Sequence, residues 1–145
     1  SQLDRFMLRL SLDYPDATAE RALLTGSDRR DLLAQLMPQL DGAALLALHG
    51  EAQSITASSA LLDYLQALLA ASRRHPEIRA GLSPRAGLAL LGAARAWAML
   101  SGRRHVLPED IQALFVPLAA HRLQSARGAN GETLARQLLT EVAVD

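Results

Sequence analysis

Two residue types are absent from this chain of 145 residues, and a third class is scarce. The sequence has no cysteine and no lysine, and aromatic residues make up only 3% of it. The lack of cysteine excludes disulfides, thiolate metal sites and a cysteine nucleophile. Because half of the chain is hydrophobic yet so little is aromatic, the core must consist mainly of leucine and alanine. That composition favours packed helices over a sheet.

The chain also lacks an excess of charge and any long apolar run. Fifteen basic residues, all of them arginine, balance fifteen acidic ones, so the net charge is zero. Nucleic acids and anionic lipid surfaces are bound through excess basic charge, and we therefore expect no nucleic-acid partner. No apolar run approaches the ~20 residues of a membrane-spanning helix, and no signal peptide is visible. We expect no membrane insertion and a cytoplasmic location.

Helix start and stop signals recur along most of the chain. The length suits one domain with a small appendage. The predicted fold class is all-α, a bundle of about five to seven helices with a short N-terminal strand remnant. The helices are expected at about residues 17–24, 28–36, 42–53, 58–74, 84–101, 108–123 and 132–142.

Residues 7–12 have a different pattern, because Leu8, Leu10 and Leu12 alternate with polar residues at the period of a strand. A single strand cannot form a sheet, and no good partner is found elsewhere in the sequence. We interpret the segment as the last strand of a preceding domain. The predicted organisation is residues 1–14 as the end of that domain, 15–125 as a helical domain and 126–145 as a C-terminal helix.

The stretch Gly81-Leu82-Ser83-Pro84-Arg85-Ala86 combines several helix-start signals. Ser83 can cap the helix, and Pro84 suits the first helical position because its missing N–H would have no partner there. Arg85 would then project from a helix N-terminus, which itself attracts anions. The pattern fits a phosphate-contacting arginine, but these six residues alone favour an ordinary capped helix with a solvated arginine.

The remaining polar residues give no catalytic pattern. The four histidines at positions 49, 75, 105 and 121 show neither the i, i+4 pairing nor the flanking ligands of a metal site, so no metal site is predicted. The arginine pairs at 29–30, 73–74 and 103–104 each fall at a predicted helix end or turn, where solvated cations are usual.

Several short motifs follow one another in a specific order. No single one is strong, but the ordered set resembles the MoxR-type AAA+ ATPases over nearly the whole chain. The motifs are Gln-Leu-Asp-Arg-Phe at 2–6, Tyr14-Pro15, the stretch 81–86, Gly102-Arg103, Val106, Pro108-Glu109-Asp110-Ile111 and His121-Arg122-Leu123. Leu107 departs from the pattern, since the family often has a capping Thr or Ser there, and residues 25–40 match less well.

The resemblance is to the end of such an ATPase, comprising the last strand of the nucleotide-binding core and the helical lid. The phosphate-binding motif Gly-x-x-x-x-Gly-Lys-Ser/Thr is excluded because the chain has no lysine. Phosphoryl transfer needs that cradle and a magnesium site, so this chain alone is not expected to hydrolyse ATP. The resemblance implies ATP and Mg as cofactors of the full-length protein, with none bound by this part.

The resemblance also implies roles for individual residues. Arg85 occupies the sensor-2 position, where the lid reaches the nucleotide phosphates, with Ser83 and Pro84 beside it. Arg5 occupies the position of a possible arginine finger that acts in trans on a neighbouring subunit. The implied partners are the ATPase core of the same chain, neighbouring subunits of a homo-oligomeric ring in chaperone-like work, and von Willebrand factor A domain proteins.

An alternative hypothesis is a free-standing helical adaptor or DNA-binding bundle with no nucleotide role. The neutral charge counts against DNA binding. The unpaired strand at 7–12 counts against a free-standing domain, because an exposed apolar edge favours aggregation. The lid of a AAA+ ATPase is therefore the preferred hypothesis.

Overall fold

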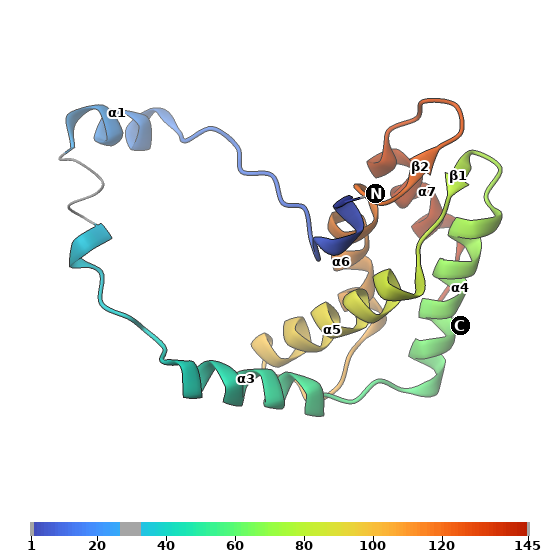
Figure 1. The fold of residues 1–145 in the computed structure, drawn as a ribbon, viewed down its shortest axis with the longest axis horizontal. Helices are drawn as coiled ribbons and strands as arrows, with labels where there is room; N and C mark the ends of the chain where they lie inside the picture. The colour runs from blue at the N-terminus through green and yellow to red at the C-terminus, as the bar shows by residue number, and fades with distance from the viewer. Residues whose placement is uncertain (1, 27–32, 145) are drawn as a thin grey trace.

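A computed structural model describes residues 2–26 and 33–144, and its regular secondary structure is almost entirely helical (Figure 1). The predicted all-α fold is confirmed. A short 3-10 helix, η1 (Gln2–Arg5), opens the described chain. The longer elements are α1 (Ala17–Thr25), α3 (Gly42–Ser54), α4 (Ser59–Arg74), β1 (Ile78–Ala80), α5 (Pro84–Leu100), α6 (Pro108–Ala119), β2 (Gln124–Ser125) and α7 (Gly131–Glu141).

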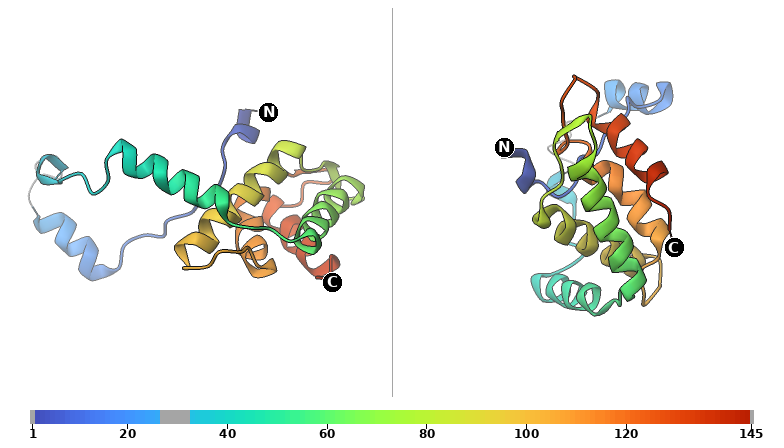
Figure 2. Two further views of the ribbon diagram at one scale, coloured as in Figure 1. Left: turned by 90° about the horizontal axis from the view of Figure 1, so that it is seen from below. Right: turned by 90° about the vertical axis from the view of Figure 1, so that its right-hand side faces the viewer.

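The hydrophobic core is formed by α4, α5, α6 and α7, which pack against one another (Figure 2). Helix α4 buries Leu61, Leu65 and Leu68 at helical spacing. On α5, small residues such as Ala94 and Ala98 are fully buried, which allows the close approach of α6. The core also includes Leu134, Ala135 and Leu138 of α7, so the C-terminal helix is packed into the same hydrophobic cluster.

Helix α5 is central to the bundle, but it is not packed on every side. It contacts α3, α4 and α6. Leu88 and Leu100 are nevertheless 74% and 78% exposed, and Trp97 is about half exposed. Apolar residues occur on all sides of α5, but the described neighbouring helices cover only part of its surface.

A small antiparallel sheet was not predicted. β1 pairs with β2, with Ile78 opposite Ser125 and Ala80 opposite Gln124. The sequence gives no signal for this sheet, because strands of two and three residues are too short to show an alternating pattern. The pairing joins the chain before α5 to the chain after α6.

The expected strand at residues 7–12 has no strand partner in the described parts of the chain, and residues 8–16 have no regular secondary structure. The Arg9 N–H donates to the carbonyl of Pro117 at 2.9 Å, which ties the segment to α6. Leu8 is half-buried against the core, whereas Leu10 and Leu12 are 73% and 97% exposed. A strand needs a continuous hydrogen-bonding neighbour, and the described residues supply none here.

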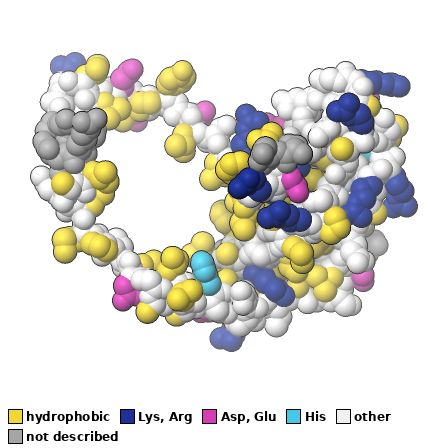
Figure 3. All heavy atoms as spheres, in the orientation of Figure 1, with side chains coloured by type: hydrophobic (Ala, Val, Ile, Leu, Met, Phe, Trp, Pro, Cys, Tyr) yellow, Lys and Arg dark blue, Asp and Glu magenta, His cyan; other side chains and the backbone are white. Residues whose placement is uncertain are grey.

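The part of the chain at residues 7–54, described at 7–26 and 33–54, forms an arm that leaves the core and returns to it through α3 (Figure 1). Neither α1 nor α3 contains a buried residue. Where α3 contacts α5, its Ala44, Leu48 and Ala52 are half-buried, while Leu46 on the same helix is 71% exposed. Figure 3 shows hydrophobic side chains along the described parts of the arm.

A helix was predicted at residues 28–36, and most of this range lies outside the described residues. Within its described part, residues 33–35 are helical. No described helix is both long enough and apolar enough to cross a membrane.

Candidate functional site

The start of α5 has the geometry that its sequence predicts. The Ser83 hydroxyl accepts a hydrogen bond from the Ala86 N–H at 3.2 Å, and Pro84 occupies the first turn. The side chain of Arg85 is exposed and forms no hydrogen bond or ion pair within the described residues. A rigid helix end therefore presents a guanidinium group whose donors are available to a ligand.

The end of α4 holds this helix start in place. The buried Ser72 hydroxyl accepts from the Leu82 N–H at 3.0 Å, and the Arg73 Nε donates to the Leu82 carbonyl at 2.9 Å. At Gly81 the two backbones touch, because a Cβ there would lie only 2.5 Å from the Ser72 carbonyl oxygen. The glycine at the first position of the motif is thus explained by this close approach.

The N-terminal segment lies beside the same helix start. The Asp4 carboxylate oxygens are each 3.4 Å from the Ser83 hydroxyl, which is longer than an ordinary hydroxyl–carboxylate hydrogen bond. Arg5 follows directly in η1 and its side chain is exposed. The structure therefore brings together two motifs that are 79 residues apart in sequence.

Arg122 is the residue that sequence reasoning missed. Only 3% of its side chain is exposed, and its Nε lies 3.3 Å from the nearer Asp4 carboxylate oxygen. The sequence placed it at a helix end, where arginines are usually solvated. The one sign in the sequence that Arg122 matters is that it belongs to the ordered set of motifs. No local pattern distinguishes a buried arginine from an exposed one.

A second arginine explains another of the motifs. Arg103 binds the Asp110 carboxylate with both terminal nitrogens, at 2.8 and 2.6 Å. Burial alone would raise the pKa of Asp110, but hydrogen bonds from Arg103 and from the Leu107 N–H, together with nearby positive charge, lower it below its usual value. Leu107 has no capping side chain, and the carboxylate of Asp110 accepts from its N–H at 2.8 Å instead. This motif therefore stabilises the start of α6.

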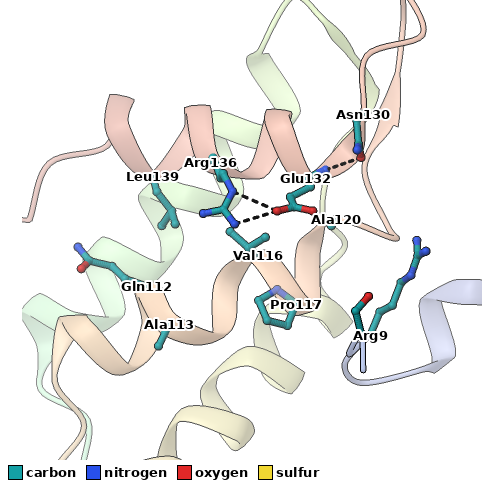
Figure 4. Close-up of a pocket in the computed structure, with 11 residues that line it drawn as sticks. Arg9, Gln112, Ala113, Val116, Pro117, Ala120, Asn130, Glu132, Arg136 and Leu139 are labelled. Atoms are coloured by element: carbon teal, nitrogen blue, oxygen red, sulfur yellow. Dashed lines mark hydrogen bonds and ion pairs between the residues drawn. The ribbon is translucent and has the colours of Figure 1, made fainter. Parts of the chain in front are cut away.

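A polar groove of about 530 Å³ lies elsewhere, between α6, α7 and the N-terminal segment (Figure 4). Arg136 and Glu132 on α7 form an ion pair of 2.8 Å along it, and Arg9 lies on the opposite side. None of Arg5, Ser83, Pro84 and Arg85 lines it. Among the described residues, no cluster of three or more His, Asp or Glu side chains could hold a metal ion.

Comparison with known proteins identifies this arrangement. The family model described as the AAA lid domain matches residues 70–142, which span α5, α6, α7, both strands and the end of α4. The chain belongs to the AAA lid domain family. The helix start carrying Arg85 and the Arg103–Asp110 pair both lie within the matched part of this lid domain.

Its relatives show that the lid domain is of the MoxR type. It is 34% identical to Protein MoxR of Paracoccus denitrificans, over 83% of this chain and 41% of that protein. It is 29% identical to Chaperone MoxR1 of Mycobacterium tuberculosis, over 85% of this chain and 34% of that protein. The uncharacterized protein YeaC of Bacillus subtilis is 30% identical over 99% of this chain and 47% of its own length.

A solved structure supports the same assignment. The crystal structure of a candidate ATPase from Cytophaga hutchinsonii matches with a TM-score of 0.80 and 26% sequence identity, over 99% of this chain and 48% of that one. This lid domain thus spans about half the length, or less, of the proteins that it resembles.

Proposed function

We propose that this chain is the lid of an ATP-hydrolysing MoxR-type AAA+ protein and that Arg85 contacts the phosphates of the bound nucleotide. The observation that carries the proposal is the exposed Arg85 side chain, which lacks a partner in the described structure and extends from the capped first turn of α5. Leu82 donates one hydrogen bond to the Ser72 hydroxyl and accepts another from Arg73, and the two bonds fix this helix start against α4.

The chemistry of the site suits a phosphate ligand. A guanidinium group is planar and matches phosphate oxygens with two parallel N–H donors, which a lysine cannot do. Ser83 and Pro84 orient the helix end, whose backbone N–H groups carry partial positive charge. Bound Mg-ATP supplies the phosphoryl group for hydrolysis. The cradle for it must come from residues outside this sequence, because the chain contains no lysine for a phosphate-binding loop.

In this proposal the lid responds to the nucleotide by moving. When Arg85 gains or loses a phosphate contact, the helical body around α5 shifts relative to the ATPase core. Arg5 acts in trans on a neighbouring subunit of a homo-oligomeric ring, where an arginine finger contributes about 4–7 kcal/mol of transition-state stabilisation. In this hypothesis the ring acts as a chaperone-like protein in the cytoplasm and has von Willebrand factor A domain proteins as partners.

The test is steady-state ATP turnover by the full-length protein that carries this lid. We expect Arg85→Ala to lower kcat/KM for ATP by about 10- to 100-fold, the range for loss of hydrogen bonds to a charged group. Arg85→Lys is expected to recover only part of the loss, since it keeps the charge but not the planar pair of donors. Circular dichroism checks that the lid stays folded.

Arg127→Ala is the matched control, because Arg127 is equally exposed but lies in the loop after β2. It should leave turnover unchanged. Turnover of Arg85→Ala equal to wild type across all ATP concentrations would overturn the proposal. If the wild-type protein instead binds duplex DNA and hydrolyses no ATP, the alternative hypothesis of a DNA-binding bundle replaces it.

A further inference from the structure

The buried guanidinium of Arg122 is saturated by contacts to the N-terminal segment. Its Nη2 donates to the carbonyls of Asp4, at 3.2 Å, and of Phe6, while its Nη1 donates to the carbonyl of Met7, at 3.0 Å. Its Nε reaches the Asp4 carboxylate at 3.3 Å. Nη1 also donates to the carbonyl of Leu118 on α6, so all three nitrogens are engaged.

These polar contacts, rather than apolar burial, hold the segment in place. Phe6 and Met7 are 60% and 53% exposed, and Leu8 alone in residues 3–8 packs against the core as a half-buried side chain. An arginine whose side chain is 3% exposed needs a counter-charge, because an unpaired buried charge is strongly destabilising. In the described chain, Asp4 is the carboxylate in an ion pair with Arg122.

Asp4 also links this contact to the start of α5. Its carboxylate lies 3.4 Å from the hydroxyl of Ser83, the cap residue two positions before Arg85. Arg5 is the residue next to Asp4. The contact between Asp4 and Ser83 therefore lies next to Arg5 on one side and two residues from Arg85 on the other, although the two arginines are far apart in sequence. On the face shown in Figure 3, arginine side chains gather around the described start of the chain.

We propose that Arg122 is a positioning residue that fixes the Asp4–Met7 segment, and with it Arg5, beside the helix start that carries Arg85. The two arginines then sit on one body, so a movement of α5 is transmitted to Arg5 through Asp4 and Arg122. The consequence for ATP turnover rests on the function proposed above, whereas the positioning itself is a property of this chain.

Hydrogen exchange of the 145-residue chain tests the positioning directly. The reporter is the Arg9 amide, which donates to the Pro117 carbonyl at 2.9 Å only while the segment stays docked. We expect Arg122→Ala to speed exchange there by about tenfold to a hundredfold, as for the loss of hydrogen bonds to a charged group, while Leu90 in the centre of α5 exchanges as before.

Two further variants keep this test decisive. Asp4→Asn removes the counter-charge at a side chain that is 39% exposed, so the core should fold even if Arg122→Ala does not. It should accelerate exchange at Arg9 in the same direction. Arg136→Ala is the control, because it breaks an exposed ion pair with Glu132 on α7. Exchange at Arg9 that stays at the wild-type rate in both Arg122→Ala and Asp4→Asn overturns the proposal.

A double-mutant cycle in the full-length protein tests the consequence for turnover. Arg122→Lys keeps a positive charge but cannot reach every carbonyl, and we expect it to lower kcat while KM for ATP changes by less than about twofold. Its effect should not add to that of Arg5→Ala, because both remove the same positioned group. Additive effects would show that Arg122 does not act through Arg5.

The two proposals can fail separately. If Arg85→Ala leaves turnover unchanged while Arg122→Ala frees the Arg9 amide, the nucleotide-sensing function is wrong and the positioning by Arg122 stands. If the Arg9 amide is unaffected while Arg85→Ala lowers turnover, the positioning is wrong and the sensing function stands.

Discussion

The helical core at residues 55–142 and the arm at residues 7–54 are both rich in leucine and alanine, yet they bury these residues very differently. In the core, Leu90 and Phe115 are completely buried, whereas in the arm Leu12 and Tyr14 are 97% and 99% exposed. Both regions contain capped amphipathic or apolar helices. The difference is that α4 to α7 cover one another, while α1 and α3 have few described neighbours.

The comparison teaches that apolar content alone does not make a core. Burial needs several elements whose apolar faces meet, and α3 shows the limit because it is rich in alanine and leucine but packs mainly against α5 and buries no residue. Many leucines of the arm and of the outer face of α5 are exposed, and exposed apolar surface often marks a site of interaction with another protein surface. This agrees with a lid that spans about half of its longer relatives.

The largest expected effect comes from truncating a buried side chain in the core and comparing it with the same truncation in the arm. Phe115→Ala should lower the free energy of unfolding by about 3–5 kcal/mol, because it removes a fully buried side chain and leaves a cavity. Leu12→Ala, in the arm, should change it by less than about 0.5 kcal/mol. Urea unfolding followed by circular dichroism measures both. Equal losses would contradict the division between core and arm.

An intermediate effect concerns the joint between α4 and α5. Gly81→Ala would place a Cβ 2.5 Å from the Ser72 carbonyl, and we expect a loss of about 1–3 kcal/mol from the forced backbone shift. Gly92→Ala is the matched control, since nothing lies within 4 Å of its Cβ position in the middle of α5. There alanine should stabilise the protein by about 0.5–1 kcal/mol. The unfolding midpoints of the two variants should therefore move in opposite directions.

The smallest effect compares two similar helix caps. Ser58 accepts from the Leu61 N–H at 3.1 Å at the start of α4, and Asp16 accepts from the Ala19 N–H at 2.7 Å at the start of α1. Ser58→Ala should cost about 1 kcal/mol of global stability. Asp16→Ala should leave the unfolding midpoint unchanged, because α1 contributes no buried residue to the core, and should only speed amide exchange within α1. A global loss from Asp16→Ala as large as that from Ser58→Ala would show that the arm unfolds together with the core.

The start of α5 was the most predictable part of the candidate site. The cap at Ser83, the proline in the first turn and the helix beginning at Pro84 are all confirmed, because each depends on residues within one turn of the others. The roles of Arg5 and Arg85 stay predictions. Arg122 could not have been chosen from the sequence as a buried residue, since its partners are up to 118 residues away.

In the fold, too, features that depend on neighbouring residues were predicted, and features that depend on distant residues were not. The bounds of α4, α5 and α7 and the start of α6 followed from caps and from the 3.6-residue period, which are local signals, whereas α6 ends at Ala119 and not at the predicted residue 123. The strand expected at residues 7–12 and the missed β1–β2 pair both concern strands, whose existence depends on a partner elsewhere in the chain. On α3, Ala44, Leu48 and Ala52 are half-buried while Leu45 and Leu46 are exposed, and this choice depends on where α5 lies.

The sequence by itself determined the helical class, the helix starts and the family, because composition, caps and ordered motifs are read along the chain. Tertiary structure alone decided which leucines are covered, that Gly81 meets Ser72, and that Arg122 joins Asp4 across most of the chain length. The physical reason is that hydrogen bonding within a helix depends on neighbours in sequence. Burial and the pairing of a buried charge depend on which distant surfaces come into contact.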